Sequence, residues 1–268
     1  MFTDGLRHGA NLVGVPTGLL ASAAFNDYPL PLHIAGVFDI HRELFDAVAA
    51  ATAPSEAAEI FEHYMSTTFA LRDKDTPASL ATAPRRYRAS YLQLLRGWGF
   101  DSNSREGAVL KAWVESRFGL LPRFHREPLA RIASSAWTGY VEDKLSSRFH
   151  NNSIFLQLDL LYEFCQMMLA RWHHPGRHVA LYRGVNDYVE HCVVHDENNG
   201  DIIVRMNNLV SFTQHRSIAC QFGDHLLAVR VPKVKVMFFS DLLLRHPLKG
   251  EAEYLVIGGD YRVSASYY

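Results

Sequence analysis

The stretch KGEAEYLVI occupies residues 249–257, and its second half is aromatic and β-branched. This composition predicts a buried strand over residues 254–257, which two glycines then end. Because side chains alternate along a strand, Glu251 and Glu253 are expected to point the same way at its entrance. Two carboxylates this close repel each other, which tends to raise the pKa of one while the other stays ionised. The pair suits chemistry in which one carboxylate holds a cation and the other takes a proton, although a solvated strand edge often carries the same alternation.

The composition is that of a soluble globular protein without a strong charge bias. Its 268 residues are 48% hydrophobic and 12% aromatic, enough for one large core or two modest ones. With 27 basic and 28 acidic residues, neither nucleic acid nor an anionic membrane is expected as a partner. Three widely spaced cysteines without a CxxC pair argue against disulfides and cysteine-bound metal, and favour a reducing cytoplasm. No apolar stretch is long enough to predict a membrane span, and glycine and proline interrupt the signal-peptide-like run at residues 12–24.

The first two thirds of the chain carry apolar residues at helical spacing. The last predicted helix, 156–172, is apolar on nearly every side, which indicates a core helix around which other elements pack. We interpret Gly97-Trp98-Gly99 as punctuation between two helices. The predicted helices cover residues 40–53, 54–71, 84–95, 106–118, 128–145 and 156–172.

After Gly176 the pattern changes to short runs of strand composition. Asn199-Gly200 between two of them predicts a tight hairpin turn. The predicted fold class is therefore α+β, with a helical part over residues 1–175 packed on a mostly antiparallel sheet core over residues 176–268. No linker separates the two parts, so they also fit one fused domain. The predicted strands cover residues 178–182, 190–195, 202–206, 209–212, 226–231, 234–239, 254–257 and 261–267.

Common cofactor motifs are missing from the sequence. On a helix, His191 and His195 would share a face and could bind zinc, but the predicted hairpin puts them on a strand without a third ligand. We therefore expect no metal. The chain also lacks GxGxxG and a complete phosphate-binding loop, which argues against a Rossmann dinucleotide site and against an NTPase.

An arginine ends one of the predicted strands, in the run VALYRG at residues 179–184. The planar and permanently charged guanidinium of Arg183 suits bidentate contact with a pyrophosphate. Gly184 would let another group approach the backbone at this point. An arginine that only extends its head group into water would leave the same pattern.

A second strand, in the run LVSFT at residues 209–213, ends in alternating hydroxyls, and a short helix is expected over 214–222. Ser211 and Thr213 share a face of the strand, opposite Phe212. We expect Ser211 to orient a carboxylate or a ribose by hydrogen bonding, and Thr213 to cap the following helix.

These motifs occur in a fixed order on predicted strands of one sheet: Arg183-Gly184, then Ser211-Phe212-Thr213 with Ala219 and Phe222 behind it, then Glu251-Ala252-Glu253. The ordered set resembles the R-S-E signature of the mono-ADP-ribosyltransferases. Glu-x-Glu is the form associated in that class with arginine as the acceptor, whereas Ser-Phe-Thr departs from the usual Ser-Thr-Ser. Residues 11–26 and 94–119, and the overall size, resemble the NAD-dependent dinitrogenase reductase ADP-ribosyltransferases of nitrogen-fixing bacteria.

The resemblance implies a site that consumes NAD as a substrate. Arg183 with Gly184, the Ser211-Phe212-Thr213 motif and Phe222 would bind NAD, with Phe222 stacking on the nicotinamide or its ribose. Glu253 would be the catalytic carboxylate, oriented by Ser211, and Glu251 would bind the acceptor arginine and take its proton. The implied acceptor is an arginine of dinitrogenase reductase, and the transfer would release nicotinamide and switch off nitrogen fixation. Residues 1–175 would be the platform for this target and for a PII-type regulator.

Two other functions fit the same residues. A glycosidase or NAD glycohydrolase could use Glu251 and Glu253 as an acid/base pair. Carboxylates two residues apart on one strand are poorly placed to flank a sugar, however, and Arg183 would then have no role. A non-catalytic binding module could also retain the sheet without turnover.

Overall fold

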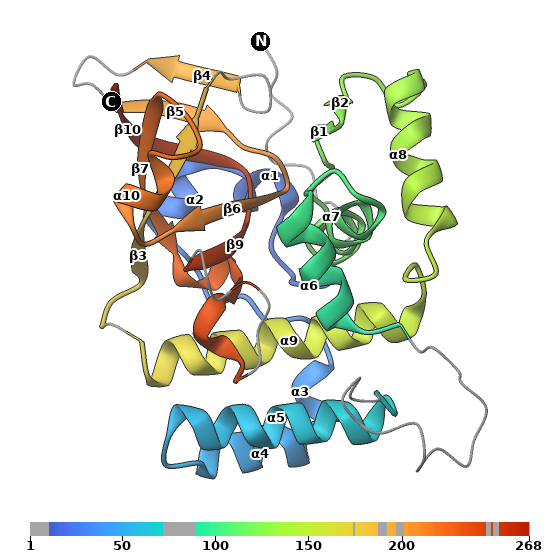
Figure 1. The fold of residues 1–268 in the computed structure, drawn as a ribbon. Coiled ribbons are helices and arrows are strands. Elements are labelled where there is room, and N and C mark those ends of the chain that lie inside the picture. Colours follow the sequence, from blue (N-terminus) through green and yellow to red (C-terminus); the bar gives the residue numbers. More distant parts are fainter. Residues whose placement is uncertain are drawn as a thin grey trace.

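The computed structural model describes residues 11–71, 89–173, 175–186, 192–196, 201–244, 248 and 252–267. Most helices lie in the first part of the chain and most strands in the second, which confirms the predicted α+β class (Figure 1). The helices are α1 (Thr17–Leu20), α2 (Ala23–Asp27), α3 (Val37–Ile40), α4 (Arg42–Ala50), α5 (Pro54–Thr68), α6 (Tyr91–Phe100), α7 (Arg105–Phe118), α8 (Ser135–Ser146), α9 (Asn152–Arg171) and α10 (Arg216–Ala219), with the 3₁₀ turns η2 (Lys233–Lys235) and η3 (Ser240–Leu242). The strands are β1 (Phe124–His125), β2 (Glu127–Pro128), β3 (His178–Val185), β4 (Cys192–Asp196), β5 (Asp201–Arg205), β6 (Leu209–Thr213), β7 (His225–Pro232), β8 (Val236–Phe239), β9 (Glu253–Ile257) and β10 (Asp260–Tyr267).

Two helix boundaries differ from the prediction by five residues or more, because capping and tertiary packing set them. The start predicted at residue 128 is wrong: residues 127–128 form β2, and α8 begins after Ser134, whose Oγ accepts a hydrogen bond from Trp137 N at 3.2 Å. The end predicted at residue 95 is also wrong, because α6 continues through the Gly97-Trp98-Gly99 motif to Phe100. The predicted start of that helix at residue 84 lies outside the described residues.

Helix α9 is the core helix that its apolar composition predicts. It contacts α3, α5, α6 and β8, and it crosses below the sheet in Figure 1. Phe164 stacks on Phe61 of α5 with ring centroids 4.2 Å apart. On the sheet side, Gln166 Nε2 donates a hydrogen bond to the Val236 carbonyl of β8 at 2.7 Å. One continuous core cluster therefore joins side chains of the helical part to those of the sheet.

The sheet has eight strands in the order β4-β5-β10-β7-β3-β6-β9-β8, and each neighbouring pair is antiparallel. Strands β4 and β5 pair as the predicted hairpin requires, while its Asn199-Gly200 turn lies outside the described residues, as does His191. Strand β8 begins later than predicted, because residues 233–235 form η2. The registered pairing between β3 and β6 is a single pair, Tyr182 with Thr213. The sheet is therefore least continuous at this junction.

Among the described residues, no helix combines the length and the apolar character needed to cross a bilayer.

Candidate functional site

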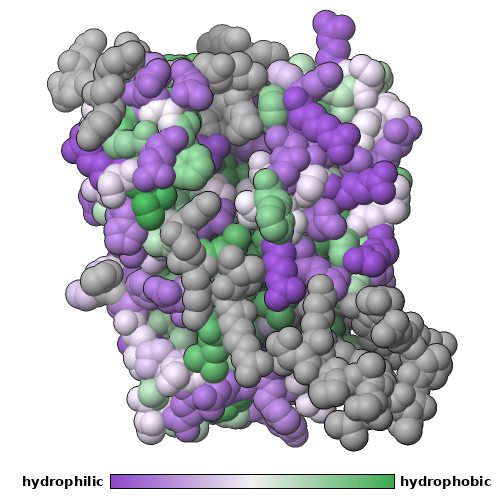
Figure 2. Space-filling model, in the orientation of Figure 1, coloured by the Kyte–Doolittle hydropathy of each residue, from purple (hydrophilic) through white to green (hydrophobic). Residues whose placement is uncertain are grey.

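A pocket of about 390 Å³ lies at the junction of β3 and β6. The residues singled out from the sequence that the structure describes all line it: Arg183, Gly184, Ser211, Phe212, Thr213, Phe222 and Glu253. Residues 98–102, from the end of α6 and just beyond it, also line the pocket. Figure 2 shows hydrophobic side chains recessed among more polar ones, in a hollow between the sheet and helices α6 and α7. Three separate strands thus bring Arg183, Ser211 and Glu253 to one site.

Hydrogen bonds connect the arginine, the serine and the glutamate. Arg183 Nη1 donates to the main-chain carbonyl of Ser211 at 2.9 Å, and Ser211 Oγ donates to Glu253 Oε1. Ser211 pairs with Leu255 in the ladder between β6 and β9, so Glu253 is its diagonal neighbour. Diagonal neighbours on adjacent strands are within reach of a long side chain. The sheet register therefore makes this contact possible.

The main chain around Glu253 is fixed by Ser240 of η3. Ser240 Oγ accepts a hydrogen bond from Glu253 N at 2.7 Å and donates one to the Leu248 carbonyl at 3.0 Å. Ala252 has a φ of 45°, a left-handed conformation that non-glycine residues adopt uncommonly. Glu253 thus enters the pocket from a constrained turn, with its side chain buried. Glu251 lies outside the described residues.

Gly184 allows helix α10 to pack against β3. A Cβ atom at this position would lie 2.0 Å from the Ala219 carbonyl oxygen, closer than any side chain can approach. This contact brings the end of α10 to the pocket, where Phe222 is 56% exposed. The Phe222 ring is therefore accessible to a ligand.

The helix predicted over 214–222 is shorter in the structure, because α10 covers residues 216–219. Thr213 is not its N-cap, which is His215. Instead, Thr213 Oγ1 accepts a hydrogen bond from His215 N at 3.2 Å and closes a turn before the helix. Phe212 is buried with its ring centroid 6.5 Å from that of Tyr261, so its side chain belongs to the core.

Trp98 is a pocket residue that the sequence analysis missed. Its side chain is buried, and Nε1 lies 2.8 Å from Ser211 Oγ and 3.2 Å from Glu253 Oε1. Trp98 is 113 residues before Ser211, so helical periodicity could not reveal the contact. A large aromatic residue between two glycines is the available signal, but the same pattern also indicates a break between two helices.

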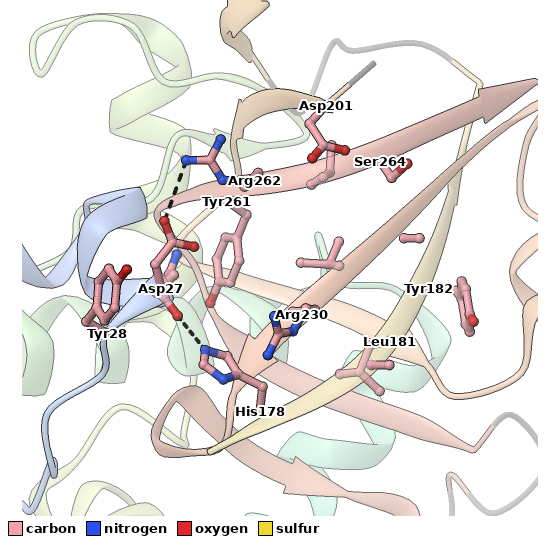
Figure 3. Close-up of a pocket in the computed structure, with 15 residues that line it drawn as sticks. Asp27, Tyr28, His178, Leu181, Tyr182, Asp201, Arg230, Tyr261, Arg262 and Ser264 are labelled. Carbon is pink, nitrogen blue, oxygen red and sulfur yellow. Dashed lines mark hydrogen bonds and ion pairs between the residues drawn. The ribbon is translucent and has the colours of Figure 1, made fainter. Parts of the chain in front are cut away.

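A larger hollow of about 630 Å³ lies on the outer face of β3, β7 and β10, near the end of α2 (Figure 3). Arg262 points toward Asp27 in this hollow, with Nη2 and Oδ2 3.5 Å apart. His178 Nε2 is 2.7 Å from the Asn26 carbonyl oxygen. The hollow contains none of Arg183, Ser211 and Glu253, so the smaller pocket is the candidate active site. Within the described ranges, no group of three or more His, Cys, Asp or Glu residues is placed to hold a metal ion.

An arginine, a serine and a glutamate from separate strands of an antiparallel sheet, converging on one pocket, resemble the R-S-E site of the mono-ADP-ribosyltransferases. The chain belongs to the dinitrogenase reductase ADP-ribosyltransferase (DRAT) family, whose sequence model matches residues 10–265. It is 56% identical to the NAD(+)--dinitrogen-reductase ADP-D-ribosyltransferase of Rhodospirillum rubrum, over 266 residues that cover 98% of this chain and 96% of that protein. No solved structure gave a significant match.

Proposed function

We propose that this protein transfers ADP-ribose from NAD to an arginine of dinitrogenase reductase and releases nicotinamide. The observation that carries the proposal is the hydrogen-bonded set of Arg183, Ser211 and Glu253 around one pocket, in a chain of the DRAT family. The named activity of the relative from R. rubrum supports the same substrates.

In this proposal NAD occupies the pocket at the β3–β6 junction. The Arg183 guanidinium binds the pyrophosphate, for which its planar fork and permanent charge are suited. Phe222 is exposed at the pocket and stacks on the nicotinamide or its ribose. Gly184, Ser211 and Thr213 complete the NAD-binding surface, with Ser211 orienting Glu253. Phe212 also lines the pocket and contributes its main chain, because its side chain packs in the core.

The chemical step breaks the bond between nicotinamide and ribose. Nicotinamide leaves with the bonding electron pair, so positive charge develops on the ribose as an oxocarbenium ion, as in glycoside hydrolysis. A carboxylate held in a water-poor site stabilises such a charge far better than water does. Glu253 supplies this carboxylate and hydrogen-bonds a ribose hydroxyl, because it is buried and lines the pocket.

The acceptor arginine must lose a proton as it forms the new bond. The pKa of an arginine guanidinium lies far above neutral, so full deprotonation at pH 7 would cost roughly 8 kcal/mol. Attack on the ribose carbon is therefore concerted with proton transfer to a carboxylate, which we assign to Glu251. The same carboxylate can bind the incoming guanidinium in bidentate fashion.

The helical part, residues 1–175, is proposed as the platform for dinitrogenase reductase, because α6 and the residues beyond it form one wall of the pocket. We propose that a PII-type regulator also binds there, that the protein acts in the cytoplasm, and that the modification switches off nitrogen fixation. Replacing an exposed cation by a bulky diphosphate would disturb a docking surface both sterically and electrostatically.

Incubation with adenylate-labelled NAD and reduced dinitrogenase reductase tests the proposal. We expect label on dinitrogenase reductase and release of nicotinamide. Label in free ADP-ribose alone would indicate an NAD glycohydrolase, and unchanged NAD would indicate a binding module.

The assignment of two carboxylates to two roles can be tested with single variants. Glu253→Gln should lose both transfer and NAD hydrolysis, because both reactions need the oxocarbenium ion. Glu251→Gln should lose mainly transfer, because water can still attack. Equal loss of both activities in the two variants would contradict this division.

A further inference from the structure

The buried tryptophan of α6 contacts two strand residues of the candidate site through one N–H group. Trp98 Nε1 lies 2.8 Å from Ser211 Oγ and 3.2 Å from Glu253 Oε1. Ser211 Oγ in turn donates to the same carboxylate oxygen. The three side chains come from α6, β6 and β9, so the contact joins the helical part of the chain to the sheet.

The chemistry of the indole sets the direction of this chain of hydrogen bonds. An indole N–H can donate but cannot accept, whereas a hydroxyl can do both. When Trp98 donates to Ser211, the serine proton is left free to point at Glu253. Glu253 Oε1 then faces two donors, and donors of this kind stabilise the negative charge of a carboxylate.

We propose that Trp98 is a positioning residue for the transfer reaction, and that its N–H holds Ser211 and Glu253 in the arrangement that stabilises the oxocarbenium ion. This inference rests on the proposed function, because it assigns Trp98 a role in that reaction. Trp98 acts through Ser211 and Glu253, and not by reacting with NAD.

The packing around Trp98 is adapted to bring the indole to the sheet. A Cβ atom on Gly97 would lie 2.4 Å from Glu106 Cβ of α7, and one on Gly99 would lie 2.1 Å from Leu248 Cδ2. Both contacts are too short for a side chain, so the two glycines let α6 approach its neighbours closely. Over the indole ring, Lys111 Nζ lies 5.9 Å from the centroid, within the range of a cation–π contact.

The variant Trp98→Phe tests the proposal, because it keeps an aromatic ring and removes the N–H group. We expect kcat for NAD cleavage to fall roughly 10- to 100-fold, the effect of losing one hydrogen bond to a charged group. The KM for NAD should change less than about twofold, since Trp98 positions the charge-stabilising group and does not bind NAD. The acid limb of the pH–rate profile should move to higher pH, because Glu253 loses a donor that favours its ionised form.

Trp113 provides a matched control in the same protein. It is also buried, and its Nε1 donates to Asp159 Oδ1 at 2.7 Å. Neither Trp113 nor Asp159 lines the candidate pocket. Asp159 keeps a bidentate contact with Arg117 when that N–H is lost. Trp113→Phe should therefore lower the thermal midpoint about as much as Trp98→Phe and leave kcat and the pH profile unchanged.

An NMR measurement gives a second test that does not require Trp98→Phe to fold. The indole Nε1–H signals of the four tryptophans can be assigned with ¹⁵N-labelled tryptophan and Phe variants of the other three. In Glu253→Gln, the signal of Trp98 should shift while that of Trp113 stays in place.

The outcomes separate this inference from the proposed function. Absence of NAD consumption by the wild-type protein would overturn the proposed function itself. With an active wild-type protein, normal kcat in Trp98→Phe, an equal loss of kcat in Trp113→Phe, or an unmoved Trp98 signal would overturn the role of Trp98 alone.

Discussion

Ser211 donates a side-chain hydrogen bond to Glu253 on the neighbouring strand, although the main chains pair Ser211 with Leu255. The contact runs diagonally across two strands and reaches a glutamate buried at the edge of a pocket. Because Arg183 also donates to the Ser211 carbonyl, one serine connects the other two residues of the signature. Ser211 is therefore the structural centre of the candidate site.

Arg183→Lys should raise the KM for NAD about 10-fold or more, because lysine keeps the charge but loses the planar fork that matches a pyrophosphate. Steady-state kinetics of NAD cleavage would measure this. Arg230→Lys is the matched control, since Arg230 is exposed on the outer face of neighbouring strand β7. An equal KM for the two variants and the wild type would contradict the role of Arg183.

Gly184→Ala should destabilise the protein by about 1–3 kcal/mol, the usual cost of overpacking. Its Cβ would overlap the Ala219 carbonyl and push α10 away from β3. Denaturant unfolding would measure the loss. Gly139→Ala in α8 is the control, because a Cβ there meets no atom within 4 Å. That variant should be neutral or more stable by about 0.5–1 kcal/mol, the helix preference for alanine over glycine.

The fold class and the existence of the long helices and strands can be predicted from local sequence pattern, for a physical reason. The long apolar run of α9 predicts a buried helix, and the aromatic and β-branched run of β9 predicts a buried strand. The structure confirms both elements. The start of α8 was missed because Ser134 acts through a single capping contact, which periodicity does not register. The extent of α6 was missed because tertiary packing outweighs the low helix propensity of Gly97 and Gly99.

The candidate site was predictable where its residues lie in ordered motifs on strands. Arg183, Ser211 and Glu253 do meet at one pocket, as the resemblance implies, although their catalytic roles stay predictions. Trp98 could not be placed from sequence, since its contact with Ser211 depends on how α6 packs on the sheet. A single sequence carries no local signal for a contact between two residues that are 113 positions apart.

Lys235→Met should stabilise the protein at pH 6, and the difference in unfolding free energy from the wild type should decrease as the pH rises. Burial lowers the pKa of Lys235 from 10.5 to about 7 in the native state. Between pH 7 and pH 10.5, Lys235 is protonated in the unfolded chain and largely neutral in the native protein. The unfolded state therefore binds more protons, and the free energy of unfolding of the wild type rises with pH in this range. At pH 6 the native protein carries the full cost of a buried charge, and the variant should be more stable by about 2–4 kcal/mol.

The pH dependence of this stabilisation can be measured from the unfolding free energies of the wild type and of Lys235→Met between pH 6 and about pH 10. The variant also loses the hydrogen bond from Lys235 Nζ to the Gly258 carbonyl, which is 3.1 Å long, so the gain at pH 6 is a net value. A difference between the two proteins that does not vary with pH would show that the lysine is not the titrating group.

The most direct test of the account is the rate of nicotinamide release from NAD by the wild-type protein and by Glu253→Gln, with NAD binding measured in parallel. Glutamine keeps the size of the side chain and one acceptor oxygen, and removes the charge. We expect Glu253→Gln to bind NAD with similar affinity and to release nicotinamide about 100- to 1000-fold more slowly. Release at the wild-type rate would contradict the assignment of Glu253 as the charge-stabilising carboxylate.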